Sequence, residues 1–558
     1  MHRLATALFL CASAALQAQP TQLRLSVTAS DPRHAMGVAW TTPDDVPTRV
    51  EHRLAGSSAA PVQTSGGAAQ NVTGVGFVHT AELTGLATDT AYDYRVGDGT
   101  TWSGWKTFRT APEACAAWSF IAVGDDRADP ILNSGRGVSP KWGPIAEEAA
   151  ATTPAPKLFI NSGDLVYDGS DNAQWADWLA SSETVTSIIP HMPVLGNHDA
   201  KGSGVEYTFN DVFFLPRNDE TQSENYYAFR YANALFIAFT TASDDEGTAS
   251  DPRPFARQGA WMRRVLEANQ DATWKFVFLH HPSFTSGGAR FIAWDLGHPP
   301  NEKEQNAVLL PLLDEFHVDF VIAGHNHWYE RFEALRQGTT LEEGAPAAGP
   351  DTGTQHLITG GAGAVTLDFD IGSWNPIDLI CGNTHPGQVQ CTGEHHYVRF
   401  EIHGNALTMT TTATACQNDN CNHPSTPLDT LTYVKGGADA CGGSTSGSSS
   451  SGPPSSSSRA GSSSNAAPAS SSSAAVGGSS SATAATSAAA PPSSTASASG
   501  GVTASSGSGA VQASSGSGAA PGDETPSCGC STGDRGTPVA AAALLLAAAT
   551  LARTRRRR

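Results

Sequence analysis

Residues 157–168 read KLFINSGDLVYD, an apolar run that leads directly into a cluster of polar side chains. The apolar residues predict a short buried strand, and the Gly and Asp residues after it predict a loop. Four further apolar runs lead into clusters of the same kind, rich in Asp, Asn and His, at residues 120–127, 192–199, 275–282 and 320–327.

Helix-length stretches separate these runs, at residues 145–151, 173–181, 259–269 and 303–316. Strands that alternate with helices predict an α/β sheet, and ligands in such sheets gather beyond the carboxyl ends of the strands. All five polar clusters stand at that end of their strands. We therefore expect them to meet in one site.

The residue types in these clusters predict a metal site. Each cluster is weak evidence by itself, because a Gly-Asp pair is usually a turn, but five in series are a strong signal. Oxygen donors from Asp, Asn and Tyr mixed with imidazoles suit Fe, Zn or Mn, and the absence of cysteine argues against a structural zinc site. Asp164 is well placed to bridge two cations, since one carboxylate can serve a pair about 3.5 Å apart.

The motif order GD, GDxxY, GNH, HxP and GHxH resembles that of the calcineurin-like metallophosphoesterases and, more specifically, of the purple acid phosphatases. The motifs lie within residues 118–405. The resemblance implies a four-layer α/β/β/α domain that holds two metal ions, Fe with Fe, Zn or Mn. It implies a first metal held by Asp125, Asp164, Tyr167 and His327, and a second held by Asp164, Asn197, His280 and His325.

The resemblance also implies a catalytic histidine. His198 would lie beside the substrate phosphate and help to protonate the leaving group. In the pair His280 and His281, the family ligand stands two residues before the proline, so His280 is the expected ligand. His281 is then a structural or substrate-facing histidine.

Arg127 departs from the family pattern, in which a small residue stands at this position. Arginine cannot ligate a metal, so the first metal depends on Tyr167, whose phenolate would favour ferric iron. Arg127 would either donate two hydrogen bonds to the substrate phosphate or form an ion pair with Asp126 or Asp129. His298 is a second candidate for substrate binding; otherwise it is a surface loop residue.

Residues 20–110 predict a separate β sandwich. Short strands are expected at residues 23–27, 37–40, 48–52 and 92–96, with turn residues between them. Residues 79–96 resemble fibronectin type III domains, and residues 20–110 resemble the N-terminal domain of secreted purple acid phosphatases. We interpret Trp40, Trp102 and Trp105 as core or interface aromatics in preference to a carbohydrate-binding surface.

The two ends of the chain resemble targeting segments. Residues 1–18 have the positive start, short apolar core and small final residue of a secretory signal peptide. Residues 528–558 combine a Cys-Gly-Cys motif, a short apolar stretch and an arginine cluster, and resemble the C-terminal sorting signals of myxobacterial surface proteins. The alternative is a retained transmembrane anchor stopped by the arginines. We expect a secreted protein attached to the cell envelope by its sorting or anchoring machinery.

Residues 442–526 consist almost entirely of Ser, Ala, Gly, Thr and Pro, which predicts a disordered stalk. This segment explains why only 39% of the chain is hydrophobic and 15% is charged. Residues 442–558 hold seven basic and three acidic residues, which gives them a net charge of +4. Because the whole chain has a net charge of −20, residues 1–441 have a net charge of −24. Such an acidic protein is not a nucleic-acid scaffold, which needs a basic face.

Six cysteines outside the two ends of the chain predict disulfides, because a secreted protein meets an oxidising environment. Six cysteines allow 15 pairings. Proximity in sequence favours Cys381 with Cys391 and Cys416 with Cys421, which leaves Cys115 for Cys441.

The glycine-rich run at residues 360–364 could suggest a nucleotide-binding loop, but no Gly-Lys-Ser/Thr follows it. We predict a close-packed turn beside the site, and the resemblance implies the same.

The leading hypothesis is a hydrolase of phosphate monoesters that attacks phosphorus with a metal-bridging hydroxide. Its partner would be a phosphorylated small molecule. A phosphodiesterase with the same site is the first alternative, and the sequence does not separate the two. A non-catalytic surface-adhesion protein, built from the sandwich, stalk and anchor, is the alternative from another class, and the complete ligand set argues against it. Residues 118–440 form the predicted metallophosphoesterase domain.

Overall fold

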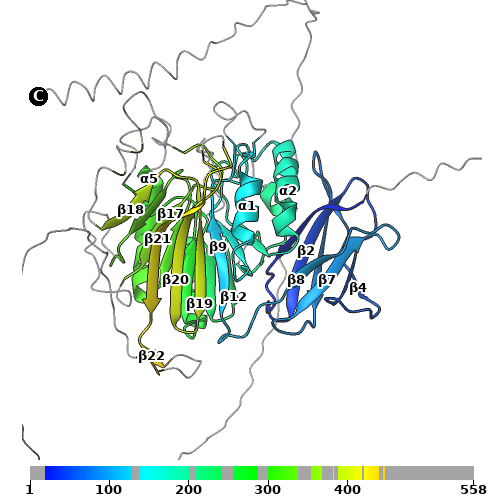
Figure 1. The fold of residues 1–558 in the computed structure, drawn as a ribbon, viewed down its shortest axis with the longest axis horizontal. Coiled ribbons are helices and arrows are strands. Elements are labelled where there is room, and N and C mark those ends of the chain that lie inside the picture. The colour runs from blue at the N-terminus through cyan, green and yellow to red at the C-terminus, as the bar shows by residue number, and fades with distance from the viewer. Residues whose placement is uncertain are drawn as a thin grey trace, which may run out of the picture. The chain divides into compact units, whose positions relative to one another are not determined.

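The computed structural model describes residues 19–128, 137–201, 208–219, 222–241, 255–286, 299–336, 353–366, 377, 381, 387–417, 420–438 and 444–445 (Figure 1). The predicted signal peptide, His298, the C-terminal sorting segment and nearly all of the predicted stalk lie outside these residues. The exception in the stalk is residues 444–445, which form a short strand and not the disordered chain that the sequence predicts.

The N-terminal part is a β sandwich of two four-stranded antiparallel sheets, as the sequence predicts. One sheet has the order β1(Thr21–Ser26), β2(Ala35–Thr42), β6(Gly76–Thr84), β5(Gln70–Val72). The other has the order β4(Val62–Ser65), β3(Arg49–Leu54), β7(Ala91–Gly97), β8(Lys106–Arg109). Trp40 is fully buried between them and stacks on His79, which confirms it as a core aromatic.

Trp102 and Trp105 are less buried than Trp40. Trp105 is 36% exposed, and the guanidinium of Arg95 lies 4.8 Å from the ring centre of Trp102 and 4.7 Å from that of Trp105. These two tryptophans therefore pack against arginine and not within the core.

The second part contains two larger sheets. The six-stranded sheet has the order β11(His191–Pro193), β10(Phe159–Asn161), β9(Trp118–Val123), β19(His396–His403), β20(Ala406–Ala413), β21(Thr426–Val434). The seven-stranded sheet has the order β12(Tyr227–Tyr231), β13(Ala234–Ala238), β14(Trp274–Phe278), β15(Phe320–Ala323), β17(Gln355–Thr359), β16(Tyr329–Phe332), β18(Gln388–Thr392). A further short pair joins β22(Gly437–Ala438) to β23(Ser444–Thr445).

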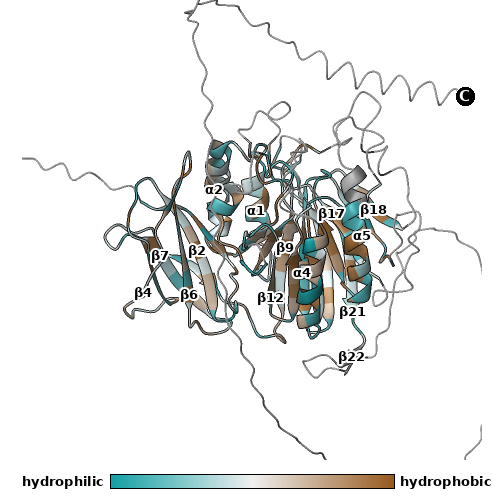
Figure 2. Cartoon of the chain, turned by 180° about the vertical axis from the view of Figure 1, so that it is seen from behind, coloured by the Kyte–Doolittle hydropathy of each residue, from teal (hydrophilic) through white to brown (hydrophobic). Residues whose placement is uncertain are grey.

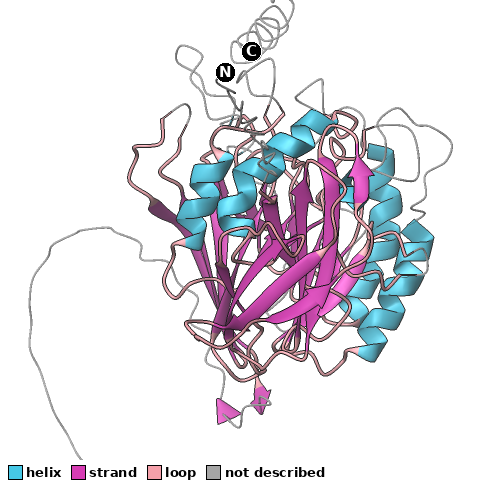
Figure 3. Ribbon diagram, turned by 90° about the vertical axis from the view of Figure 1, so that its right-hand side faces the viewer, coloured by secondary structure: helices cyan, strands magenta, loops and turns pink. Residues whose placement is uncertain are grey.

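Helices cover the outer faces of these sheets, which confirms the four-layer α/β/β/α arrangement (Figure 3). The helices are α1(Trp142–Ala150), α2(Asn172–Thr186), α3(Thr208–Val212), α4(Phe255–Ala268) and α5(Pro299–Glu315). Four of them correspond to predicted helices and begin one to four residues earlier than expected. At α2 the reason is visible, because the side chain of Asp171 caps the helix by accepting from the backbone N–H of Ala173.

The two sheets pack face to face through aromatic rings. Phe120 of β9 lies between sheets, with ring centres 5.1 Å from Phe236, 5.1 Å from Phe276 and 4.5 Å from Phe400. On the outer face of the seven-stranded sheet, a second core joins β13 and β14 to α4 and α5. Figure 2 shows the result: apolar strands lie behind α4 and α5, whose visible faces carry polar residues.

The sandwich and the second part are joined by buried hydrogen bonds. The Tyr94 hydroxyl donates to the Ser187 carbonyl at 2.8 Å, and the Thr186 hydroxyl donates to the Leu23 carbonyl at 3.0 Å. Thr186 and Ser187 lie at the C-terminal end of α2, and Tyr94 and Leu23 belong to the sandwich. The end of this helix therefore connects the two parts.

Strands β19, β20 and β21 were not predicted. In β20 alternate residues are only half-buried, and many of them are threonine, so the strand lacks the continuous apolar run that marks β9 or β14. No polar cluster follows these strands, and they complete the sheet without contributing to the site.

Two of the predicted disulfides are present, between Cys381 and Cys391 and between Cys416 and Cys421. Cys115 is also disulfide-bonded, while its predicted partner Cys441 lies outside the described residues. Among the helices that are described, none has the length and apolar character needed to cross a membrane.

Replacing Phe120 with alanine tests the core between the sheets. Phe120 is fully buried against three other phenylalanines, so the cavity left by Phe120→Ala should lower the free energy of unfolding by about 3–5 kcal/mol. Val62→Ala, at a residue that is 59% exposed, should change it by less than about 0.5 kcal/mol. Denaturant unfolding monitored by circular dichroism measures both, and equal effects would contradict this description of the core.

Candidate metal centre

Five strand ends bring the predicted ligands together. Asp125 follows β9, Asp164 follows β10, Asn197 follows β11, His280 follows β14 and His325 follows β15. Strands β9, β10 and β11 run parallel to one another, as do β14 and β15, so the loops after them emerge at the same edge of each sheet. The sequence prediction that these clusters meet is confirmed.

Three of these residues have a left-handed backbone. The φ angles are 60° at Asp125, 59° at Asp164 and 68° at His325. Such angles cost about 1–3 kcal/mol for a residue with a Cβ and concentrate at functional sites. The loops therefore hold these side chains in directions that an unconstrained chain would rarely choose.

Gly163 and Gly196 have no side chain, and this makes room for Asp164. Gly163 has a φ of 98°, and a Cβ at Gly196 would stand 2.2 Å from both the backbone nitrogen and Oδ1 of Asp164. No real side chain tolerates that distance. The glycines of the GD and GN motifs are thus required for the strand ends to approach each other.

The atoms Asp164 Oδ1, Asn197 Oδ1, His280 Nε2 and His325 Nδ1 form a compact group. His280 Nε2 lies 2.9 Å from Asn197 Oδ1 and 3.2 Å from Asp164 Oδ1, and His325 Nδ1 lies 3.1 Å from Asn197 Oδ1. Ligands bonded to one ion at about 2.1 Å stand about 3.0–3.4 Å from one another. The spacing in this group, which corresponds to the predicted second metal position, fits a shared cation.

His280 has the orientation and electrostatic surroundings of a metal ligand. Its Nδ1 donates to the Ser162 carbonyl at 2.8 Å, which turns Nε2 toward the group. Burial lowers the pKa of His280, but Asp164 and, more weakly, Asp125 outweigh burial and raise this pKa to about 9. The surroundings thus favour a positive charge, and a cation that binds here would displace the proton.

The predicted first metal position contains an unpaired buried oxygen. Asp125 is fully buried, and its Oδ1 has no hydrogen-bond donor within the described part of the chain. That oxygen lies 3.5 Å from His327 Nε2, while His327 Nδ1 donates to the Val365 carbonyl at 2.9 Å. A buried carboxylate oxygen without a donor is costly unless a cation pairs with it.

The Arg127 guanidinium enters this first position. Its Nε donates to Asp164 Oδ2 at 3.0 Å, and its Nη2 lies 3.2 Å from His327 Nε2. Asp126, one of the ion-pair partners considered for Arg127, instead accepts from Asn161 and Trp178, and that alternative is wrong. The other, Asp129, lies outside the described residues.

His198 lies beside the ring of Tyr167, with ring centres 4.9 Å apart. The backbone N–H of His198 donates to Asp164 Oδ1 at 2.9 Å, and His198 Nδ1 lies 2.6 Å from the Tyr167 carbonyl oxygen and 3.0 Å from Lys201 Nζ. Burial lowers the pKa of His198 well below its usual value; Asp164 opposes this, and the positive charges of Arg127 and Lys201 add to it. A metal-ligand role for the Tyr167 hydroxyl stays a prediction.

Asp199 holds the loops in place, a role that the sequence interpretation missed. Its two carboxylate oxygens accept from the backbone N–H groups of Asp164, Leu165, Val166 and Gly196 at 2.8–3.1 Å. Burial and the charge of Asp164 raise the pKa of Asp199 to about 7, while the N–H donors act against this rise. The sequence feature that could have indicated this role is the position of Asp199 at the end of the GNHD run.

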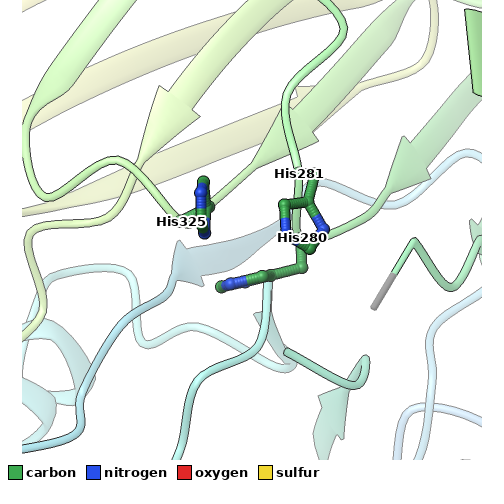
Figure 4. A group of neighbouring side chains, drawn as sticks. All are labelled: His280, His281 and His325. Carbon is green, nitrogen blue, oxygen red and sulfur yellow. The ribbon is translucent and has the colours of Figure 1, made fainter. Parts of the chain in front are cut away.

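A third imidazole lies next to the second position. Figure 4 shows His280 and His281 on one loop and His325 on the next, and their ligand atoms lie within 4.8 Å of one another. Asp125, Asp164 and His280 form a second group with the same spacing. His281 was not expected to ligate, and its contact with His325, at 4.4 Å between ring centres, makes it a further donor within reach.

The donors that the structure brings together suit a pair of cations. Asp164, Asn197, His280 and His325 would hold one, and Asp125, Asp164 and His327 would hold the other, where Tyr167 stays the predicted fourth ligand. The glycine-rich run also behaves as predicted, because a Cβ at Gly360 would stand 2.1 Å from the Asn326 carbonyl oxygen. It is a close-packed turn beside the site.

A buried pair at the edge of the site, His395 and Lys141, carried no sequence motif. Lys141 Nζ lies 3.0 Å from His395 Nε2, and His395 Nδ1 lies 3.0 Å from the Gly361 carbonyl. Burial, with the charge of Lys141, lowers the pKa of His395 to about 3, so the imidazole is neutral.

Comparison with known families places both parts of the chain. Residues 20–110 match the purple acid phosphatase N-terminal domain, and residues 142–329 match the calcineurin-like phosphoesterases. The second match contains every predicted ligand except Asp125, which lies ahead of it in the sequence.

Curated relatives come from bacteria and plants. An uncharacterized protein of Mycobacterium tuberculosis is 30% identical over 51% of this chain and 58% of its own length. The Arabidopsis thaliana protein named probable inactive purple acid phosphatase 1 is 25% identical over 53% of this chain and 50% of its own length. Purple acid phosphatase 23 of the same plant is 26% identical over 29% of this chain and 33% of its own. The chain thus spans about half the length of the first relatives it matches.

Solved structures show the same fold. A purple acid phosphatase from yellow lupin seeds, PPD1, aligns with a TM-score of 0.58 at 19% identity, over 75% of this chain and 74% of its own. PhoD aligns with a TM-score of 0.54 at 12% identity, over 75% of this chain and 90% of its own.

Replacing Asp164 tests the shared ligand. Because one carboxylate oxygen of Asp164 faces each position, Asp164→Ala should prevent both cations from binding. Asp168→Ala is the matched control, since Asp168 accepts from Ser170 in a neighbouring turn. Elemental analysis of the purified proteins measures bound metal, and a full metal content in Asp164→Ala would refute the shared role.

Proposed function

Because this chain is a purple acid phosphatase-like metallophosphoesterase of the calcineurin type, we propose that it hydrolyses phosphate monoesters at the candidate binuclear site. The observation that carries the proposal is the group of donors around Asp164, with two imidazoles and an amide oxygen at ligand spacing on one side. Some relatives are named inactive, and the intact donor set is the reason to expect activity here.

Bound cations would lower the pKa of a water molecule and neutralise charge on the phosphoryl group. The chain itself supplies position and proton transfer. Tyr167 and Lys201 both contact His198 through Nδ1, so Nε2 is the ring nitrogen left to exchange a proton with the leaving oxygen. The buried Arg127 supplies a permanent positive charge at the site, in a protein whose net charge is negative.

A parallel assay decides between the proposal and its alternatives. Purified full-length protein, reconstituted with Fe, Zn or Mn, is offered a phosphate monoester and a phosphate diester. We expect faster turnover of the monoester. Preference for the diester would replace the proposal with a phosphodiesterase, and no turnover of either with metal bound would favour the adhesion protein.

His198→Ala tests the proposed proton donor. It should keep its metal content and lower turnover of the monoester by about 10²–10⁴-fold, the usual contribution of proton transfer. His403→Ala, at an exposed histidine on the far end of β19, should leave turnover unchanged. Turnover of His198→Ala at the wild-type rate would remove the residue from the mechanism.

We further propose that the protein is exported and held at the cell envelope through residues 528–558. The charge and apolar pattern of residues 1–18, the long uncharged stretch before the Cys-Gly-Cys motif and the terminal arginines support this. Fractionation of cells that express the full chain should find it with the envelope, and a chain that ends at residue 527 should appear in the medium. Equal distribution of both chains would contradict the anchoring role.

A further inference from the structure

Arg127 uses the atoms that the first cation would need. Its Nε hydrogen-bonds to Asp164 Oδ2 at 3.0 Å, and its Nη2 lies 3.2 Å from His327 Nε2. The guanidinium carbon also lies 5.5 Å from the centre of the Tyr167 ring. Three of the four residues assigned to the first position therefore contact this one side chain.

The contact with His327 involves the lone pair that would bind metal. His327 Nδ1 donates to the Val365 carbonyl at 2.9 Å, so the proton of the neutral ring is on Nδ1. Nε2 then carries the lone pair, and a guanidinium can only donate to it. A hydrogen bond from Arg127 and a bond to a cation exclude each other at this atom.

The second position has a different environment. Asp164 Oδ1, Asn197 Oδ1, His280 Nε2 and His325 Nδ1 lie 2.9–3.2 Å from one another along three contacts. Arg127 contacts Asp164 through the other carboxylate oxygen, Oδ2. A cation can therefore enter the second position without displacing the guanidinium.

One donor of the Arg127 side chain has no partner within the part of the chain that the structure describes. Its side chain is only 9% exposed, yet Nη1 is buried and has no acceptor within the described residues. Buried guanidinium groups with a purely structural role normally satisfy their donors. Among the described residues, Asp164 and His327 are therefore the contacts that a cation at the first position would have to displace.

We propose that Arg127 makes the two cation positions unequal. The second position binds a divalent cation tightly by itself, whereas the first fills only when a cation displaces the guanidinium from Asp164 and His327. Arg127 acts here as a competitor for ligand atoms and as a fixed positive charge near them. The inference rests on the proposed function only in treating these residues as metal ligands.

The test is a calorimetric titration of the metal-free, full-length protein with Zn²⁺. We expect one tight equivalent and a second that binds at least about 10-fold more weakly, the scale on which neighbours of metal ligands affect affinity. In Arg127→Gln and Arg127→Ala the second equivalent should tighten by at least about 10-fold. Arg127→Gln keeps most of the side-chain volume and removes the charge, so it serves if Arg127→Ala does not fold.

Matched variants assign each equivalent to its position. His327→Ala should remove the weak equivalent and leave the tight one, and His280→Ala should do the reverse. Arg95→Ala, which breaks a surface ion pair with Glu51 in the sandwich, should leave both affinities unchanged. Elemental analysis after dialysis gives the stoichiometry independently of heat.

Two equally tight equivalents in the wild type, or a second equivalent that is unaffected by both Arg127 variants, would overturn the inference. Hydrolysis of a phosphate monoester is measured on the same samples. Unequal binding without hydrolysis would leave this inference intact and refute the proposed function, while hydrolysis with equal binding would do the opposite.

Discussion

The carboxylate of Asp164 is the interaction on which the site depends. It is buried between the ends of β10 and β11, where one oxygen faces His280 and the backbone of His198 and the other faces Arg127. Burial opposes the charge, but His280, His198 and Arg127 hold the pKa of Asp164 well below its usual value. A permanently ionised carboxylate between two groups of donors is what allows a single side chain to serve two cation positions.

The surrounding fold keeps this carboxylate in one place. Asp199 accepts from the backbone N–H groups of Asp164 and Leu165 and also from that of Gly196, so it ties the loop after β10 to the loop after β11. The absence of a side chain at Gly196 lets these loops touch. The loops after β14 and β15 come from the other sheet, and the aromatic packing of Phe120, Phe276 and Phe400 between the sheets sets their distance from Asp164. The positions of the ligand side chains thus depend on the aromatic packing between the two sheets.

Much of this arrangement was predictable from the sequence, for a physical reason. Buried parallel strands read as apolar runs, and the chemistry follows them immediately, so the runs ending at Asp125, Asp164 and His280 reveal both sheet and site. Strand β20 and the His395–Lys141 pair were not predicted, since neither has an apolar run with a polar end. The contacts of Arg127 could not be predicted either, because they join residues 37 and 200 positions apart whose mutual orientation only the folded loops determine.

The central claim is that Asp164 and its neighbours hold cations, and anomalous X-ray scattering tests it most directly. A crystal of the protein grown with Zn²⁺, measured at the zinc absorption edge, should show a strong peak enclosed by Asp164, Asn197, His280 and His325. Scattering with no peak within bonding distance of Asp164 Oδ1, in protein that is otherwise folded as described, would contradict the account.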